Sequence, residues 1–264
     1  MIDHCLLIRR LTLAILLTAG ACGRPSSPQR LWKAGERQAS LPSRMLWAWE
    51  RPEDLRFIDP HRFGVALLAA TLHLVGNDVR VRPRLQPISV PPECPTVAVI
   101  HIESDTRQRP LLNAALRRAV LRSILHQMKD TRAKALQIDF DARQSERTFY
   151  HDLLFDLRGS LPYSTGLAMT ALASWCLDDD WLESLPVDEA IPMLFRMGAD
   201  ALTIRAALTA GANFRSPLCR QSWGVATDEP LPLILSGRRL YLFSSRPWSR
   251  MELARIMQRT EAQP

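Results

Sequence analysis

The sequence lacks several patterns that mark common classes of protein. No glycine-rich phosphate loop follows a predicted strand, which argues against a nucleotide enzyme, and no GxSxG elbow is present, which argues against the serine esterases that use it. No CxxC pair or cysteine–histidine cluster occurs, so we predict no metal site, and no motif indicates a cofactor. Lysine is scarce among the 34 basic residues, and the arginines are scattered among acids. The net charge of +7 therefore does not predict a nucleic-acid partner.

No long apolar run is present at the start of the chain either. Arg9 and Arg10 precede an apolar run, Leu11–Ala19, that is far shorter than the roughly 20 residues a membrane-spanning helix needs. A basic start, a short apolar core and small residues before a boundary are typical of a secretory signal, which we place at residues 1–21.

The end of this predicted signal is similar to the lipobox of bacterial lipoproteins, in which a cysteine is lipidated and becomes the mature N-terminus. The matching residues are Ala19-Gly20-Ala21-Cys22, with alanine where leucine is usual at the first position. The resemblance implies lipidation of Cys22, and Gly23 after it implies an outer-membrane lipoprotein that faces the periplasm. An ordinary cleaved signal, and a secreted protein, is the alternative.

Residues 22–43 are rich in Gly, Pro, Ser, Gln and Arg, and we predict a flexible, lipid-anchored tether there. Residues 44–264 then form one folded domain. Its cysteines, Cys94, Cys176 and Cys219, are widely spaced and odd in number. An oxidising periplasm permits one disulfide among them, but the sequence does not select the pair.

The folded part alternates between strand and helix patterns. Period-two or short apolar runs predict strands, and apolar residues at helical spacing predict helices, with Ser145 as a cap. A turn at Gly76-Asn77-Asp78 predicts a hairpin whose second strand is weakened, or placed at an edge, by Pro83 and Pro87. The predicted strands are 45–50, 63–75, 79–88, 96–103, 135–141, 166–175, 191–197, 223–227 and 239–243, and the predicted helices are 111–129, 145–161, 200–210 and 249–259.

This order predicts an α/β fold made of parallel βαβ units. The length and strand number favour an irregular (β/α)8 TIM-like barrel in which a β-hairpin replaces an early helix. An open doubly wound sheet is the alternative.

The most informative segment is Gln137-Ile138-Asp139-Phe140-Asp141. Alternation sends Gln137, Asp139 and Asp141 to one face of the strand and the two apolar residues to the other. In a barrel the apolar face must meet the outer helices, so the polar face points inward, toward the C-terminal mouth where barrel enzymes keep their sites. Two carboxyls in one desolvated pocket suit acid–base chemistry. A structural acid pair satisfied by arginine or backbone N–H groups is the alternative.

Other residues at predicted strand ends are candidate partners of these acids. Carboxylates bind sugar hydroxyls and aromatic rings cover the apolar faces of sugars, so these residue types together predict a carbohydrate site; the tryptophans could equally be core. The candidates are Glu103 as a further catalytic acid, and Trp47, Trp49, Glu50, His101, Trp175 and Asp228, with Gln137, for binding substrate.

Several segments resemble a bacterial family of unknown function, domain-of-unknown-function family 3142, over nearly all of the chain after the tether. The segments are MLWAWERPEDLRFIDP, LQIDFDARQSERTFYHDLLFDLRGSLP, MTALASWCLDDDWLESLPVDEAIPMLFRMG and DEPLP. The resemblance implies no settled activity.

The LQIDFDA strand and the helix after it also resemble the fourth strand and helix of chitinase-type glycosidase barrels, whose motif is DxxDxDxE. Asp139 and Asp141 match its last two aspartates, but Arg143 stands where that family has its catalytic glutamate. The resemblance implies either a hydrolase in which Glu103 or Asp228 serves instead, or a sugar-binding relative without catalysis.

We therefore expect a glycoside hydrolase that acts on an envelope or extracellular polysaccharide, with Asp141 as one catalytic carboxylate and Asp139 tuning it. The alternative is a non-catalytic carbohydrate-binding or envelope-assembly lipoprotein. A metal-dependent hydrolase that uses Asp139, Asp141 and His101 is less favoured, because no histidine-rich ligand spacing supports it. The expected partners are carbohydrate and, through the anchor, the membrane.

Overall fold

The computed structural model describes residues 36–38, 40–129, 131–177, 179–231 and 237–261, all within one compact unit, Trp32–Pro264. The predicted signal, Cys22 and most of the predicted tether lie outside the described residues. None of the helices in the described ranges is long and apolar enough to cross a membrane.

Eight parallel strands close into a barrel, because the first strand pairs with both the second and the last. The structure thus confirms the predicted (β/α)8 barrel and excludes the open sheet. In chain order the barrel strands are β1 (Arg44–Ala48), β3 (Phe63–Val75), β6 (Thr96–Ser104), β7 (Ala135–Asp139), β8 (Gly166–Leu172), β9 (Glu189–Met193), β10 (Ser222–Ala226) and β11 (Arg239–Phe243).

The predicted hairpin is present in place of an early helix. The long strand β3 pairs along one edge with β1 through its first half and with the antiparallel strand β4 (Asp78–Pro83) through its second half. A register shift between Leu68 and Ala70 separates the two halves on the β6 side. The predicted second strand ends at Pro83, and Ile88 belongs instead to β5 (Ile88–Ser89), which forms a small parallel sheet with β2 (Glu53–Asp54).

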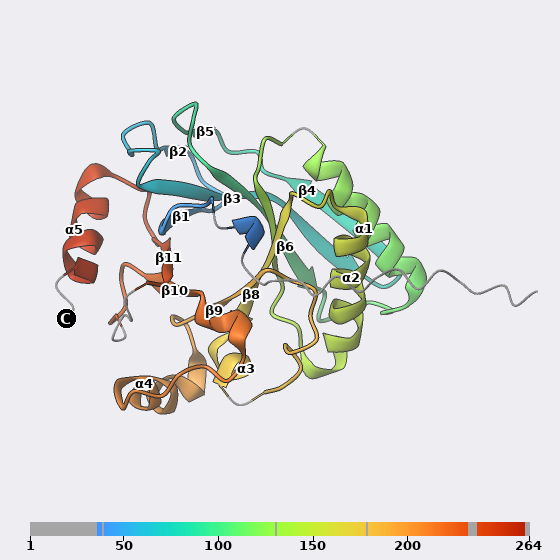
Figure 1. Ribbon diagram of the computed structural model, residues 1–264. Helices are drawn as coiled ribbons and strands as arrows, with labels where there is room; N and C mark the ends of the chain where they lie inside the picture. Colours follow the sequence, from blue (N-terminus) through green and yellow to red (C-terminus); the bar gives the residue numbers. More distant parts are fainter. Residues whose placement is uncertain (1–35, 39, 130, 178, 232–236, 262–264) are drawn as a thin grey trace, which may run out of the picture. The chain divides into compact units, whose positions relative to one another are not determined.

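The helices cover the outside of the barrel, and α1 packs against both α2 and β4 (Figure 1). The helix predicted at 111–129 begins later, at Ala114. Asn113 precedes it, and its side chain accepts the N–H of Leu116 at 2.9 Å and caps the first turn. The helices are α1 (Ala114–Met128), α2 (Arg147–Ser160), α3 (Ala173–Leu177), α4 (Ala201–Thr209) and α5 (Arg250–Glu261).

Two local predictions were wrong. Ser145 does not cap the second helix: a 3₁₀ turn, Gln144–Glu146, precedes α2, and the Glu146 carboxylate accepts the N–H of Arg143 at 2.7 Å. Trp175 does not end a strand, because β8 stops at Leu172 and α3 begins at once. The short apolar run fits a strand and a buried helix equally well, and the helix is what forms.

The core has two layers, as barrel geometry requires. Ile138 and Phe140 belong to the large outer layer between strands and helices, whereas Ala135, two residues before Gln137, belongs to a smaller cluster inside the barrel. Met45, Trp47, Val99 and Tyr241 fill that interior with other strand residues. The predicted alternation along β7 is therefore confirmed, and it turns Gln137 and Asp139 inward.

One disulfide joins α3 to a later 3₁₀ turn, Pro217–Arg220. It pairs Cys176 with Cys219, which settles the choice that the sequence left open. Cys94 is a buried free thiol.

Candidate functional site

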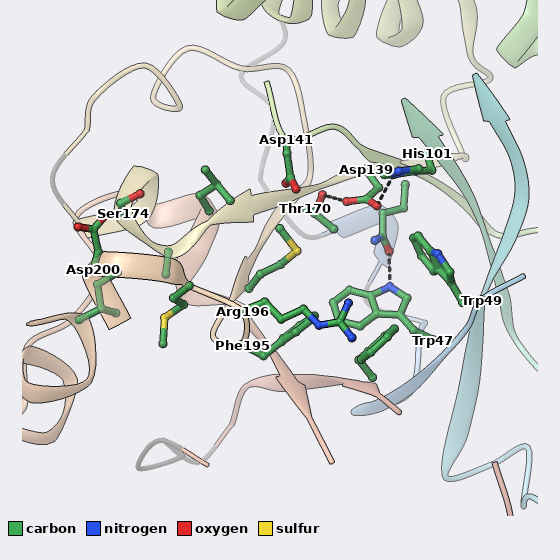
Figure 2. Close-up of a pocket in the computed structure, with 17 residues that line it drawn as sticks. Trp47, Trp49, His101, Asp139, Asp141, Thr170, Ser174, Phe195, Arg196 and Asp200 are labelled. Carbon is green, nitrogen blue, oxygen red and sulfur yellow. Dashed lines mark hydrogen bonds and ion pairs between the residues drawn. The ribbon is translucent and has the colours of Figure 1, made fainter. Parts of the chain in front are cut away.

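A pocket of about 380 Å³ opens at the C-terminal ends of the barrel strands. Side chains from β6, β7, β8 and β11, and from the segments after β1, β7 and β9, line it (Figure 2). The sequence pattern placed the site at this mouth, and Asp139 at the end of β7 and Asp141 in the segment after it both line the pocket.

Asp139, the last residue of β7, is 8% exposed and has a partner for each carboxylate oxygen. The Thr170 hydroxyl donates to Oδ1 at 2.5 Å, and His101 Nδ1 lies 2.8 Å from Oδ2. Donors on both oxygens stabilise the charged form of a buried carboxyl. The two contacts therefore hold the Asp139 side chain in one orientation.

His101 lies between two acids. Its Nδ1 contacts Asp139, and its Nε2 lies 3.1 Å from Glu103 Oε1. Burial opposes the charged imidazole, but the hydrogen bonds and negative charges of Asp139 and Glu103 outweigh it, so the pKa of His101 is raised above 6.5. The Trp49 ring meets His101 edge-on, with ring centroids 5.6 Å apart.

Asp141 has a different environment from Asp139. Its carboxyl makes no hydrogen bond or ion pair with the part of the chain that the structure describes, and it points into the pocket near Thr170 (Figure 2). Desolvation by the surrounding wall and then the charge of Asp139 raise the pKa of Asp141, while the charge of His101 opposes this shift. The residue is nevertheless exposed to solvent at the mouth. The two acids therefore differ in burial and in hydrogen bonding.

Gln137 lies deeper, below Asp139, and is fully buried. Its Oε1 accepts the indole N–H of Trp47 at 3.4 Å, and its Nε2 has no partner among the residues that the structure describes. A buried amide donor without a hydrogen-bond partner is costly. Gln137 lines the pocket wall. A ligand hydroxyl or a water could satisfy it.

Aromatic rings line the side of the pocket opposite the acids (Figure 2). Phe195 and Phe243 stack with an interplanar angle of 6° and centroids 5.3 Å apart. Arg196 lies 5.1 Å above the Phe243 ring and has a positive φ of 52°, with its N–H bonded to Glu229 at 2.9 Å. A strained residue held by a side-chain acceptor beside a pocket is typical of functional sites.

The structure brings five of the predicted site residues besides Asp139 and Asp141 to the pocket or its edge. Trp47, Trp49, His101 and Gln137 line it, and Glu103 contacts His101 from just outside it.

The other three predicted residues lie elsewhere. Glu50 turns away and accepts the backbone N–H groups of Leu85 and Gln86. Trp175 is buried edge-on against Trp181, with centroids 5.0 Å apart. Asp228 lies in a separate hollow beyond β10.

Several pocket residues were not predicted. Thr170 could have been found, because alternation along β8 puts it on the inner face beside Asp139. Phe195, Arg196 and Asp200 follow β9, and their place in the pocket depends on loop geometry that periodicity does not encode. Within the described ranges, no group of three or more His, Cys, Asp or Glu residues is placed to hold a metal ion.

No protein-family model matches the chain, and no curated protein matches it. Among solved structures, the chain is similar to the spore cortex-lytic enzyme SleL of Bacillus cereus, with a TM-score of 0.47 and 14% sequence identity over 84% of this chain. The match covers 59% of the SleL chain, so this chain spans less than two thirds of that protein. Similarity at this level does not bear on the reaction, and the barrel rests on its own strand pairing.

Proposed function

We propose that the protein is a glycoside hydrolase whose active site is the pocket above Asp139 and Asp141. One observation carries the proposal: two carboxyls line one pocket and differ in environment. Asp139 is buried with a hydrogen-bond partner on each oxygen, whereas Asp141 is exposed at the mouth, has no partner among the described residues and has a raised pKa. Such a difference supplies a charged group and a proton donor at one pH, which glycoside hydrolysis needs.

The roles follow from the two environments. Asp141 donates its proton to the glycosidic oxygen, and the carboxylate of Asp139 stabilises the positive charge that develops on the sugar. A water molecule then adds to the sugar and returns a proton to Asp141, so the net reaction is hydrolysis. Gln137 Nε2 supplies a hydrogen bond to a hydroxyl, and the rings of Trp49 and Phe243 cover the apolar face of the substrate.

The test is turnover of bacterial envelope and extracellular polysaccharides by the purified protein, with release of reducing ends as the measurement. Asp141→Asn should lower kcat by about 10²–10⁴-fold, the usual contribution of a general acid. Asp228→Asn is the matched control, because this aspartate lies in a different hollow, and it should leave kcat unchanged. Equal activity of wild type and Asp141→Asn would contradict the assignment.

A non-catalytic carbohydrate-binding protein is the second candidate, and Arg143 favours it. This exposed arginine stands where chitinase-type barrels have their catalytic glutamate, and it does not line the pocket. Glycan binding without turnover, lost in Trp49→Ala, would select this candidate over the hydrolase.

We also propose that the protein acts in the cell envelope, anchored through a lipid on Cys22. The signal-like residues before Cys22 support this location, and so does the Cys176–Cys219 disulfide, because disulfides persist mainly in oxidising compartments. The test is incorporation of labelled palmitate into the expressed protein. Cys22→Ser should abolish the label, and a wild-type protein without label would refute the anchor.

A further inference from the structure

An alternating row of acids and imidazoles leads away from the pocket along the inner rim of the barrel. His101 pairs in register with Asp139 on β7, and His73 on β3 pairs in register with Glu103 on β6. Because His101 and Glu103 are two residues apart on one strand, their side chains share a face. His73 Nδ1 lies 3.2 Å from Glu103 Oε2, and His73 Nε2 lies 3.2 Å from Asp105 Oδ2.

The far end of this row is fixed by the backbone. Asp105 Oδ1 accepts the N–H groups of Arg107 at 2.7 Å and Gln108 at 2.6 Å. The Gln108 hydrogen bond, then the one from His73, lowers the pKa of Asp105. Asp105 therefore presents a charged, immobile oxygen to His73.

The contacts of the two histidine rings bear on which ring nitrogens carry a proton. A neutral imidazole has one donor and one acceptor nitrogen, and an ionised carboxylate only accepts. Both nitrogens of His101, and both nitrogens of His73, face carboxylate oxygens. If the acids are ionised, a ring satisfies both of its contacts only when each of its nitrogens carries a proton.

We propose that Glu103 and His73 are positioning residues that hold His101 as an imidazolium and thereby keep Asp139 ionised beside Asp141. The inference rests on the proposed function for its catalytic consequence, though not for the charge state of His101. Neither Glu103 nor His73 lines the pocket, so both act on the substrate only through His101.

Two further charged residues of the described chain lie beside the row, Asp141 and Arg80. Asp141 also faces His101, and the Trp49 ring covers one edge of it. Arg80 on β4 lies opposite His73 in the antiparallel pair. Glu103 contacts both histidines, so its replacement changes one hydrogen-bond partner of each ring. Its side chain is 46% exposed, so Glu103→Gln should fold.

The first arm of the test measures side-chain ¹⁵N shifts of the histidines between pH 5 and 9 in the full chain. In wild type, His101 should titrate above 6.5, and Glu103→Gln should lower the pKa of His101. Glu93→Gln is the matched control, because Glu93 is exposed in the loop before β6, and it should leave the titration of His101 unchanged. A His101 titration unchanged in Glu103→Gln would overturn the proposal.

The second arm uses turnover of a glycan that the wild type hydrolyses. Glu103→Gln should lower kcat about tenfold with KM unchanged, and it should narrow the pH profile of kcat, because the imidazolium of His101 beside Asp139 would lose its proton at a lower pH. A higher KM with an unchanged profile would assign Glu103 to substrate binding and overturn the positioning role. If the wild type hydrolyses no glycan, the proposed function fails, and the first arm still decides the charge of His101.

Discussion

The Cys176–Cys219 disulfide closes the part of the chain that forms one wall of the pocket. The two cysteines are 43 residues apart, and Phe195, Arg196 and Asp200 lie on the segment between them. The N–H of Arg215 also bonds to the Cys176 carbonyl at 2.8 Å, so the ends of this segment stay together through the backbone as well. Removal of the disulfide should therefore act mainly on the unfolded chain, whose entropy it restricts.

The magnitude follows from the length of the closed segment. For 43 residues, the loop-entropy relation gives about 4 kcal/mol at 25 °C. In a domain of this size, about 2–4 °C of Tm corresponds to each kcal/mol, so Cys176→Ala/Cys219→Ala should melt about 8–16 °C lower. Both sulfurs are fully buried, so the cavities left by the alanines add to the loss.

The assay is urea unfolding of oxidised wild type, reduced wild type and the double variant. Cys94→Ala is the control, because it removes a buried thiol that forms no disulfide, and it reports the cost of truncation alone. Both forms without the disulfide should lie well below this control, and the double variant should be the less stable of the two because of its cavities. A double variant no less stable than Cys94→Ala would refute the reasoning.

Three further outcomes are expected. The pKa of His101 is higher in the folded than in the unfolded chain, so its imidazolium stabilises the fold at pH values below the unfolded pKa. This stabilisation is lost as the pH rises through the folded pKa. The urea midpoint of wild type should therefore decline over that pH range, and the midpoint of His101→Asn should lack this decline. The raised folded pKa of Asp141 likewise costs stability once pH exceeds it, so Asp141→Asn should be more stable than wild type at pH 7, with the difference shrinking toward pH 3.5. Gly224→Ala would put Cβ 2.9 Å from the Trp47 ring and 3.1 Å from the Pro192 carbonyl oxygen, and it should lower the free energy of unfolding by about 1–3 kcal/mol in the same assay.

The barrel could be predicted because its signals are local. Alternation along Ala135–Asp139 and helical spacing in the helices each depend on a few neighbouring residues, and parallel order follows from strands that alternate with helices. The same alternation correctly turned Gln137 and Asp139 inward. These predictions needed no knowledge of distant parts of the chain.

The rest of the site depends on closure of the barrel, which brings distant loops together. Asp228 follows a strand, as Asp141 does, but the chain carries it outward to another hollow. Glu50 was expected beside Trp49 in the pocket, yet backbone N–H groups of the β4–β5 segment bind its carboxylate instead. Which acid reaches the pocket is decided by such competing partners, and a single sequence does not record them.

The hairpin that replaces a helix also leaves the barrel with an open edge. The eight barrel strands themselves have no edge strand. Within the described part of the chain, however, β4 pairs only with β3, so the other edge of β4 is open to pairing with another strand. Arg80 and Arg82 project from this strand, and Pro83 ends it without an N–H to offer. Charge repulsion and the missing donor would hinder two copies of the chain from joining through β4, so the protein keeps its hairpin without becoming prone to aggregate there.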